Sequence, residues 1–151
     1  MTGAGESRTI DWAALSHALL PRRLRTRAIT VSVRTDADVY HRGDPVAVEI
    51  DLRNRLPVPI RLRTDSPNVW TWTVDGEPVD ARDVPDRPGS IHFDRGERKR
   101  FHRRWSQRVR VRDREWKPVE PGTYTIAARL SRGDAAARGL ADRTAIEIVE
   151  R

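Results

Sequence analysis

The chain has 151 residues, no cysteine and a formal net charge of +7, and 34% of its residues are charged. This length is typical of one domain with one core, and the lack of cysteine excludes disulfides, thiolate zinc sites and thiol nucleophiles. Five tryptophans and regular patterning of Val, Ile and Leu argue against a disordered chain.

The first residues, 1–23, lack both the basic start of a signal peptide and the uninterrupted apolar stretch of a membrane span. We therefore expect a cytoplasmic protein with no transmembrane segment. The absence of cysteine agrees with a reducing compartment.

A short amphipathic helix is predicted over residues 11–20, within an N-terminal segment spanning 1–27. Asp11 can cap its start, and Pro21 blocks its continuation. Such a helix is marginal alone, so it needs a surface: its own domain, a partner, or membrane headgroups attracted by the arginines that follow. Its apolar positions are Trp12, Leu15 and Leu19.

From residue 28 to 151 the hydrophobic period changes to two, the signature of half-buried antiparallel strands. Asp75-Gly76 is the strongest hairpin signal, because a type I′ turn needs positive φ at both positions. The pattern predicts an all-β, immunoglobulin-like antiparallel β-sandwich of seven to nine strands. The inward rows are Ile29, Val31 and Val33; Val46, Val48, Ile50 and Leu52; Val58, Ile60 and Leu62; Trp70, Trp72 and Val74; Ile91 and Phe93; Tyr124, Ile126, Ala128 and Leu130; and Ile146 and Ile148.

Two features of the late strands are open to more than one interpretation. The row Phe101, Trp105, Val109 and Val111 is interrupted by Arg103 and Gln107, which indicates a bend, a bulge or two strands. Tyr124, at the start of a late strand, is either a tyrosine corner whose hydroxyl returns to upstream backbone or a simple core aromatic.

A basic stripe concentrates the whole excess charge. Residues 95–114 hold ten Lys or Arg and two acids, so this segment carries +8 and the rest of the chain −1. On an extended strand its alternate residues stand about 6 to 7 Å apart, a spacing that an anionic polymer can bridge. The candidate polyanion-binding residues, which share one parity, are Arg98, Arg100, Arg104, Arg108, Arg110 and Arg112.

A structural role for the stripe is the alternative. Glu49 and Asp51 lie on a strand that neighbours it in an immunoglobulin-type sheet, so they can form cross-strand ion pairs with some of the arginines. Two carboxylates cannot neutralise the whole row. Because no aromatic residue is interleaved on the basic parity, the stacking platforms of single-strand binders are missing, and a backbone-only contact remains.

The sequence carries no catalytic motif. It has no G-x-S-x-G elbow, phosphate-cradling glycine loop or dinucleotide fingerprint. The four histidines, His17, His41, His92 and His102, lack metal-ligand spacing. We therefore expect no enzymatic activity, no cofactor and no metal site.

Several stretches resemble, in order, the intracellular proteinase inhibitor domain of the BsuPI type. They include Asn54 with the following LPVPIRL, VWTWTVDGEPV at 69–79, IHF at 91–93, GERKRFHRRW at 96–105 and PVEPGTYTIAARL at 118–130. The resemblance covers roughly residues 29–149. It implies a β-sandwich and binding to a proteinase, while its PGTY and DG motifs are structural turns.

Two loops are candidates for contact with a partner protein. The stretch 80–90 has no periodicity and is stiffened by prolines, and 113–122 carries an aromatic side chain that can serve either as an exposed anchor or as core packing. The candidate residues are Val84, Pro85, Asp86, Arg87, Pro88 and Trp116.

Three hypotheses follow for the function. The leading one is a non-catalytic interaction module that binds a protein partner through loops or the N-terminal helix. The second is inhibition of a proteinase. The third is binding of a polyanion such as nucleic acid through the arginine row.

Overall fold

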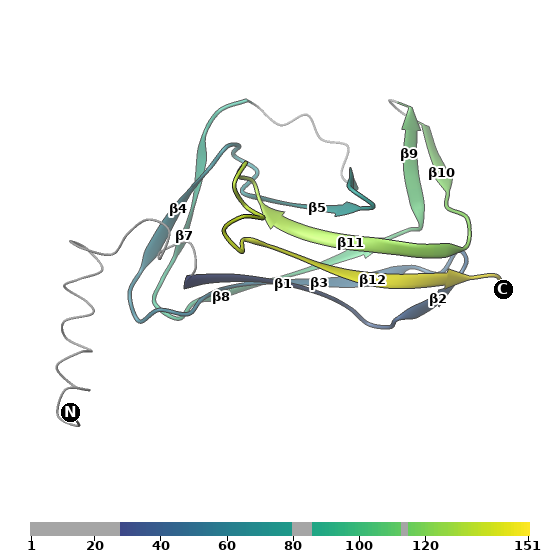
Figure 1. Cartoon of the computed structure of the whole chain (residues 1–151), viewed down its shortest axis with the longest axis horizontal. Coiled ribbons are helices and arrows are strands. Elements are labelled where there is room, and N and C mark those ends of the chain that lie inside the picture. Colours follow the sequence, from purple (N-terminus) through teal and green to yellow (C-terminus); the bar gives the residue numbers. More distant parts are fainter. Residues whose placement is uncertain (1–27, 80–85, 113–114) are drawn as a thin grey trace, which may run out of the picture.

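The computed structural model describes residues 28–79, 86–112 and 115–151. Within them the chain is built from strands that form a β-sandwich (Figure 1). The strands are β1 (Ile29–Thr35), β2 (Val39–His41), β3 (Val46–Asn54), β4 (Ile60–Thr64), β5 (Trp70–Val74), β6 (Glu77–Pro78), β7 (Gly89–Phe93), β8 (Arg98–Trp105), β9 (Arg108–Arg112), β10 (Glu115–Pro118), β11 (Gly122–Leu130) and β12 (Ala141–Val149).

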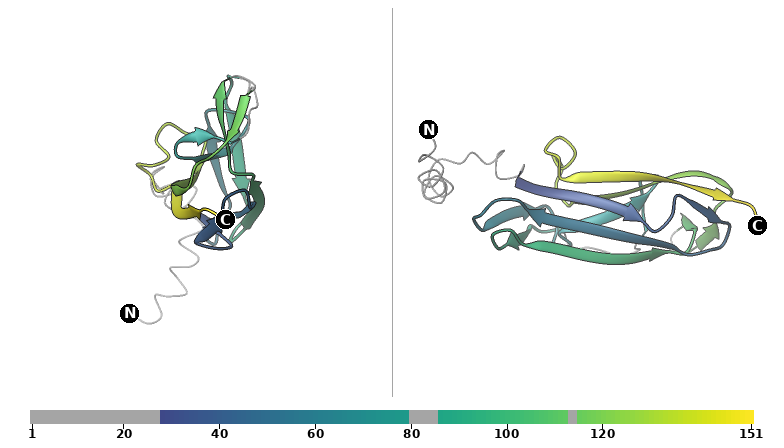
Figure 2. Two further views of the ribbon diagram at one scale, coloured as in Figure 1. Left: turned by 90° about the vertical axis from the view of Figure 1, so that its right-hand side faces the viewer. Right: turned by 90° about the horizontal axis from the view of Figure 1, so that it is seen from below.

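Two main sheets make the layers. One has the strand order β1-β3-β8, and the other has the order β2-β12-β11-β5-β6. β4 pairs with β7, and β9 pairs with β10. Figure 1 and the right view of Figure 2 show the long strands running lengthwise, with the start of β1 at one end and the C terminus at the other.

The core between the sheets comes from the alternation seen in the sequence. Along β3 the residues Val46, Val48, Ile50 and Leu52 are buried, and the residues between them are partly exposed. β4, β5, β11 and β12 contribute their buried rows in the same way. The predicted all-β fold is therefore confirmed, since burying these apolar faces against each other removes them from water.

The predicted strand count and the purely antiparallel pairing were wrong. Twelve strands lie within the described residues, because short strands such as β2 and β6 carry too few residues for a period to show. β2 also runs parallel to β12, with Tyr40 opposite Ile148. The range 113–122, interpreted from sequence as a loop, contains β10, and the range 80–90 contains the first two residues of β7.

The Asp75-Gly76 turn is confirmed. Both residues have positive φ, 48° and 81°, as a type I′ turn requires. The turn is also tied to β11, because the Asp75 amide donates to the Thr125 carbonyl at 2.8 Å and the Thr125 amide donates to Asp75 Oδ1 at 2.8 Å. The Asp75-Gly76 turn, the strongest local signal in the sequence, therefore also holds β11 in position beside β5.

Tyr124 forms the tyrosine corner, which settles the two interpretations of this residue. Its hydroxyl donates to the carbonyl of Glu120, four residues upstream. Its ring packs on Trp105 with centroids 5.6 Å apart. Burial raises the pKa of this hydroxyl above its ordinary value, so it stays a hydrogen-bond donor at neutral pH.

The break in the row after Trp105 is a bend between two strands. Gln107 has a φ of 58° and is 2% exposed, and its carboxamide is satisfied by the turn that precedes β3. Nε2 donates to the carbonyls of His41 at 2.9 Å and Asp44 at 2.7 Å, while Oε1 accepts from the Gly43 amide at 2.9 Å. The chain therefore leaves the sandwich here, and the β9–β10 hairpin stands out as an arm (Figure 1; Figure 2, left).

Because of this bend the apolar row that begins with Phe101 and Trp105 does not continue into the core beyond Gln107. Val109 is half-buried and Val111, on the arm, is 47% exposed. The predicted helix over 11–20 and its segment 1–27 lie outside the described residues. In the part that is described, no helix is long and apolar enough to cross a membrane.

Asn54, at the end of β3, makes buried hydrogen bonds whose contribution to the stability of the sandwich can be measured. Its buried Nδ2 donates to the carbonyls of Val58 at 2.8 Å and Asp94 at 3.0 Å, and its Oδ1 accepts from the Leu56 amide at 3.0 Å. Replacing it leaves buried backbone groups without partners, which costs about 1 to 3 kcal/mol for each group.

We expect Asn54→Ala to lower the free energy of unfolding by at least about 2 kcal/mol in a urea titration, because several backbone groups lose their partner together. Asn68→Ala is the matched control, since Asn68 is exposed and only its backbone is hydrogen-bonded. An effect of Asn54→Ala no larger than that of the control would contradict this role.

Candidate anion-binding site

The outer face of the β1-β3-β8 sheet gathers polar side chains in three cross-strand rows. Thr30, Arg53 and Arg98 form one row, Ser32, Asp51 and Arg100 the next, and Arg34, Glu49 and His102 the third. Arg104 lies further along, opposite Ala47. The predicted parity is thus confirmed for β8, because Arg98, Arg100 and Arg104 face away from the core.

The acidic residues sit on the central strand, as the alternative interpretation of the stripe predicted. Glu49 is bound by Arg34, and Arg100 Nε lies 3.6 Å from its Oε1. Asp51 Oδ2 lies 3.3 Å from Arg98 Nε and 3.5 Å from an Nη atom of Arg100. Glu49 therefore stands between cations of β1 and β8, while Asp51 stands between two cations of β8. Each acid reduces the repulsion between the cations that it contacts.

Asp51 orients the two β8 arginines that flank it. Its side chain is 14% exposed, and its Oδ1 is buried without a hydrogen-bond partner among the described residues. Arg98 turns its Nε toward this carboxylate, which leaves its two terminal nitrogens directed elsewhere. Asp51 thus places guanidinium groups without using up all their donors.

Arg53 and Arg55 have no such partner. Within the described residues neither forms an ion pair, and Arg53 faces Arg98 on one side and Thr30 on the other. Like charges directly opposite each other on neighbouring strands are destabilising. The sheet therefore keeps a repulsive pair that an anion would relieve.

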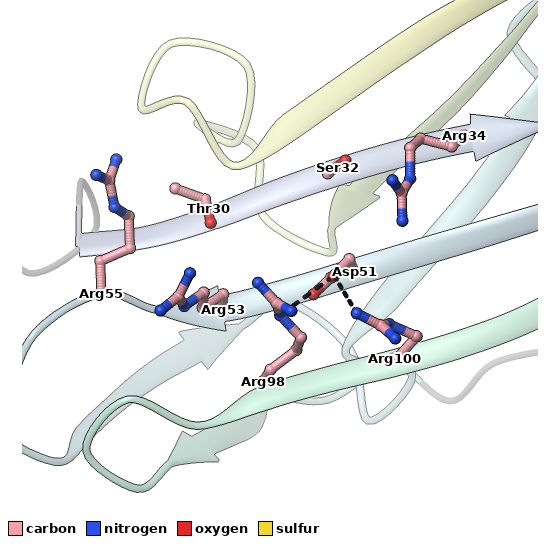
Figure 3. Close-up of a pocket in the computed structure, with 8 residues that line it drawn as sticks. All are labelled: Thr30, Ser32, Arg34, Asp51, Arg53, Arg55, Arg98 and Arg100. Atoms are coloured by element: carbon pink, nitrogen blue, oxygen red, sulfur yellow. Dashed lines mark ion pairs between the residues drawn. The ribbon is translucent and has the colours of Figure 1, made fainter.

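These side chains enclose an open hollow of about 490 Å³, which we call the arginine hollow. Figure 3 shows Arg53, Arg98 and Arg100 extending over the sheet around Asp51, with Arg55, which follows β3, beside the start of β1. Five guanidinium groups and one carboxylate line it, so its lining carries a net charge of +4. The lining residues are Thr30, Ser32, Arg34, Asp51, Arg53, Arg55, Arg98 and Arg100.

The arginine row does not form one continuous ladder. Arg98, Arg100 and Arg104 lie on the sandwich, but the bend at Gln107 places Arg108, Arg110 and Arg112 on the arm. There Arg112 Nε lies 4.0 Å from Glu115 Oε2. The structure therefore divides the predicted polyanion residues between two places.

Trp116 lies on β10 in register with Arg110 and is half-buried rather than fully exposed. Of the predicted loop residues, Asp86, Arg87 and Pro88 line a second hollow of about 410 Å³ together with Arg63 and Asp65. Its lining mixes two cations with two anions. Val84 and Pro85 lie outside the described residues.

Sequence reasoning missed Arg34 on β1, Arg53 near the end of β3, and Arg55 directly after β3. The signal was available, because Arg34 and Arg53 alternate with buried residues in their own strands. What the sequence does not contain is the strand order that brings them beside Arg98. A search for charged residues at the outward-facing positions of every predicted strand, rather than within the single segment 95–114, would have found Arg34 and Arg53.

Arg103 lies on the inward parity and does not join the hollow. Its guanidinium carbon lies 5.0 Å from the ring centre of Trp70 and 5.8 Å from that of Phe101. The two rings themselves are 4.8 Å apart. Arg103 thus covers an aromatic pair at the border of the core through cation–π contacts.

Comparison with protein families identifies the chain. The model of a family of unknown function, DUF7974, matches residues 17–149. The chain belongs to this family. No curated protein matches it. The BsuPI resemblance is supported at the level of an immunoglobulin-like sandwich, and membership of that inhibitor family stays a prediction.

Solved structures share the fold of this DUF7974 member. The CARDB domain of the PF1109 protein from Pyrococcus furiosus, in complex with di-metal ions, has a TM-score of 0.53 and 13% identity, over 82% of this chain and 94% of that domain. The alkylpurine DNA glycosylase AlkC of Pseudomonas fluorescens, bound to DNA containing an abasic site analog, has a TM-score of 0.50 and 13% identity, over 81% of this chain. The β-glucosidase EmGH1 of Erythrobacter marinus has a TM-score of 0.50 and 16% identity, over 80% of this chain.

The DUF7974 chain spans nearly all of the CARDB domain but only 30% of AlkC and 15% of EmGH1. At these identities the likeness shows the fold alone. Within residues 28–79, 86–112 and 115–151 no three His, Cys, Asp or Glu side chains are grouped so that they could hold a metal ion.

Glu49 makes the electrostatics of this face measurable. The hydrogen bond from Arg34 is the main cause that holds the pKa of Glu49 below its ordinary value, with Arg100 and His102 adding to it. Because the pKa is lowered in the folded state, the ionised carboxylate stabilises the fold above the ordinary pKa, and this contribution is lost as the pH falls.

We expect Glu49→Gln to lower the urea midpoint at pH 7, where Glu49 is ionised. The difference from the wild type should shrink between pH 5 and pH 3, because the wild-type carboxyl then becomes protonated. Glu77→Gln on β6 is the control, since Glu77 is exposed and forms no ion pair with the described residues. If the difference in urea midpoint between Glu49→Gln and the wild type is the same at pH 3 as at pH 7, the charge of Glu49 is not its cause.

Proposed function

We propose that this DUF7974 member is a non-catalytic binding module that holds an anionic macromolecule on the outer face of its β1-β3-β8 sheet. The observation that carries the proposal is the arginine hollow, where five guanidinium groups surround one carboxylate. A purely structural set of charges would pair acids with bases. Here Arg53 and Arg55 are left without an ion-pair partner among the described residues.

The chemistry of arginine supports an anionic ligand. A guanidinium group is planar, stays charged at any physiological pH, and binds carboxylates and phosphates through two parallel hydrogen bonds. The hollow presents several such forks on a sheet whose backbone is already ordered, so binding has to order side chains but not the backbone that carries them. It is open rather than enclosed, which suits a macromolecular surface more than a small molecule.

The similar structures support binding only in a general sense. AlkC was solved bound to DNA, and the PF1109 CARDB domain was solved with di-metal ions. We do not extend the metal to this chain, because the described residues offer no grouping of ligands for it. A cytoplasmic partner, either an acidic protein surface or a nucleic acid, would satisfy the proposal.

A pair of double variants tests the role of the hollow. Arg53→Ser with Arg55→Ser removes two of its cations, while Arg61→Ser with Arg63→Ser removes two exposed cations from β4. Both variants change the net charge by the same amount. We expect the hollow variant to elute from immobilised heparin at clearly lower salt than the β4 variant, because only the hollow holds the anion.

Equal elution of the two double variants would show that retention follows net charge and would refute the proposed site. Circular dichroism and urea midpoints check that both variants are folded. The substitutions at Arg53 and Arg55 break no ion pair among the described residues, so we expect no loss of stability.

Proteinase inhibition stays a separate prediction that rests on the sequence resemblance. If it is correct, the full chain at micromolar concentration should slow at least one member of a panel of serine proteinases in a peptide-hydrolysis assay. Unchanged rates across the panel would remove this hypothesis without affecting the hollow.

A further inference from the structure

We propose that the ligand of the arginine hollow is the phosphodiester backbone of a nucleic acid, bound without recognition of its bases. This inference rests on the proposed function and names the class of its ligand. Four features of the outer face lead to it: the charge density of the hollow, its remaining hydrogen-bond donors, the chemistry of its neighbours and the length of the basic row.

The charge density favours a polymer of phosphates over an acidic peptide. The lining of the hollow carries five positive charges against one negative charge within about 490 Å³. A duplex carries one negative charge for about every 3.4 Å of its axis on each strand, or about every 1.7 Å when both strands are counted. It therefore brings several charges to one hollow at once, whereas an extended peptide presents one side chain to this face only at every second residue, about 6 to 7 Å apart.

The remaining donors suit phosphate oxygens. Arg98 contacts Asp51 through Nε, so its terminal nitrogens are not used by this carboxylate. Arg53 and Arg55 have no ion-pair partner in the described ranges. The hydroxyls of Thr30 and Ser32 also line the hollow, and such hydroxyls commonly donate to phosphates together with arginine.

The chemistry of the outer face argues against base recognition. Its three cross-strand rows and Arg104 contain no Phe, Tyr or Trp, and their one ring is the imidazole of His102. The face therefore lacks the series of rings on which successive unpaired bases stack. A flat sheet lined by short hydroxyl and long arginine side chains reaches a backbone more readily than base edges in a groove. We therefore expect equal affinity for unrelated sequences and no preference for single strands.

The length of the row favours a polymer over a single nucleotide. From Arg98 to Arg104 β8 advances six residues, which corresponds to about 20 Å at about 3.3 Å per residue. This is the length of about six base pairs at about 3.4 Å each. A ligand that occupies the hollow and reaches Arg104 must therefore carry a chain of phosphates.

The test is fluorescence anisotropy of the full chain with labelled 20-base-pair duplexes of two unrelated sequences, titrated at several salt concentrations. If four to five phosphates are contacted, log affinity should fall against log salt with a slope of about −4. Both duplexes should give the same affinity. The Arg53→Ser and Arg55→Ser double variant should lose about two units of this slope and roughly tenfold to a hundredfold in affinity at 0.1 M salt.

The β4 control, Arg61→Ser with Arg63→Ser, should keep the slope of the unmodified chain. Two competitors at equal charge concentration separate the ligand classes: poly-glutamate for acidic proteins, and phosphatidylserine vesicles for anionic membranes. We expect unlabelled duplex to displace the probe more effectively than either.

The outcomes separate the two proposals. If poly-glutamate or vesicles compete as well as duplex, and the hollow variant weakens their binding too, the anion site stands and nucleic acid as its ligand is wrong. Affinity that depends on base sequence also overturns the inference. If the hollow and control variants behave alike, or if no polyanion binds, the proposed site itself is wrong.

Discussion

The alternation of β3 is the constraint on which the rest of the molecule depends. One face of this strand, from Val46 to Leu52, is almost wholly removed from water and anchors the core. The other face sets the order of charges, with Glu49 and Asp51 followed by Arg53. Because β3 pairs with both β1 and β8, its register decides which side chains of those strands face an acid and which face another cation.

Two buried carboxamides stabilise the points at which the chain turns out of the β1-β3-β8 sheet. Asn54 closes the turn after β3, and Gln107 fastens the start of the arm to the turn before β3. Both are polar residues with exposures of 2% or less, and each is satisfied by backbone groups rather than by other side chains. Such fully satisfied amides specify one geometry, since any displacement leaves several groups unpaired.

Much of the fold was predictable from sequence because its signals are local. The period of two gave the inward rows, Asp75-Gly76 gave a hairpin with its turn type, and Tyr124 was recognised as a candidate corner. The bend at Gln107 was visible only as an interruption, because its direction is set by contacts with residues more than sixty positions away.

The candidate site was predictable in part for the same reason. The basic row on β8 and its pairing with Glu49 and Asp51 followed from parity and from the usual strand neighbours. The arginine hollow did not, since it joins Arg34, Arg53 and Arg55 to that row through the order of strands in space. The N-terminal helix and part of the predicted partner loop fall outside the described residues.

One consequence concerns the position of β8 in its sheet. Among the described residues it pairs with β3 alone, so it forms an edge, and five of its eight residues are Arg or Lys. Charged side chains on an edge strand prevent it from pairing with the edge of another copy. The groups that we propose for holding an anion therefore also disfavour pairing of this edge with the same edge of another copy. A bound polyanion would neutralise this protection while it brings several copies close together, which couples occupancy of the face to self-association.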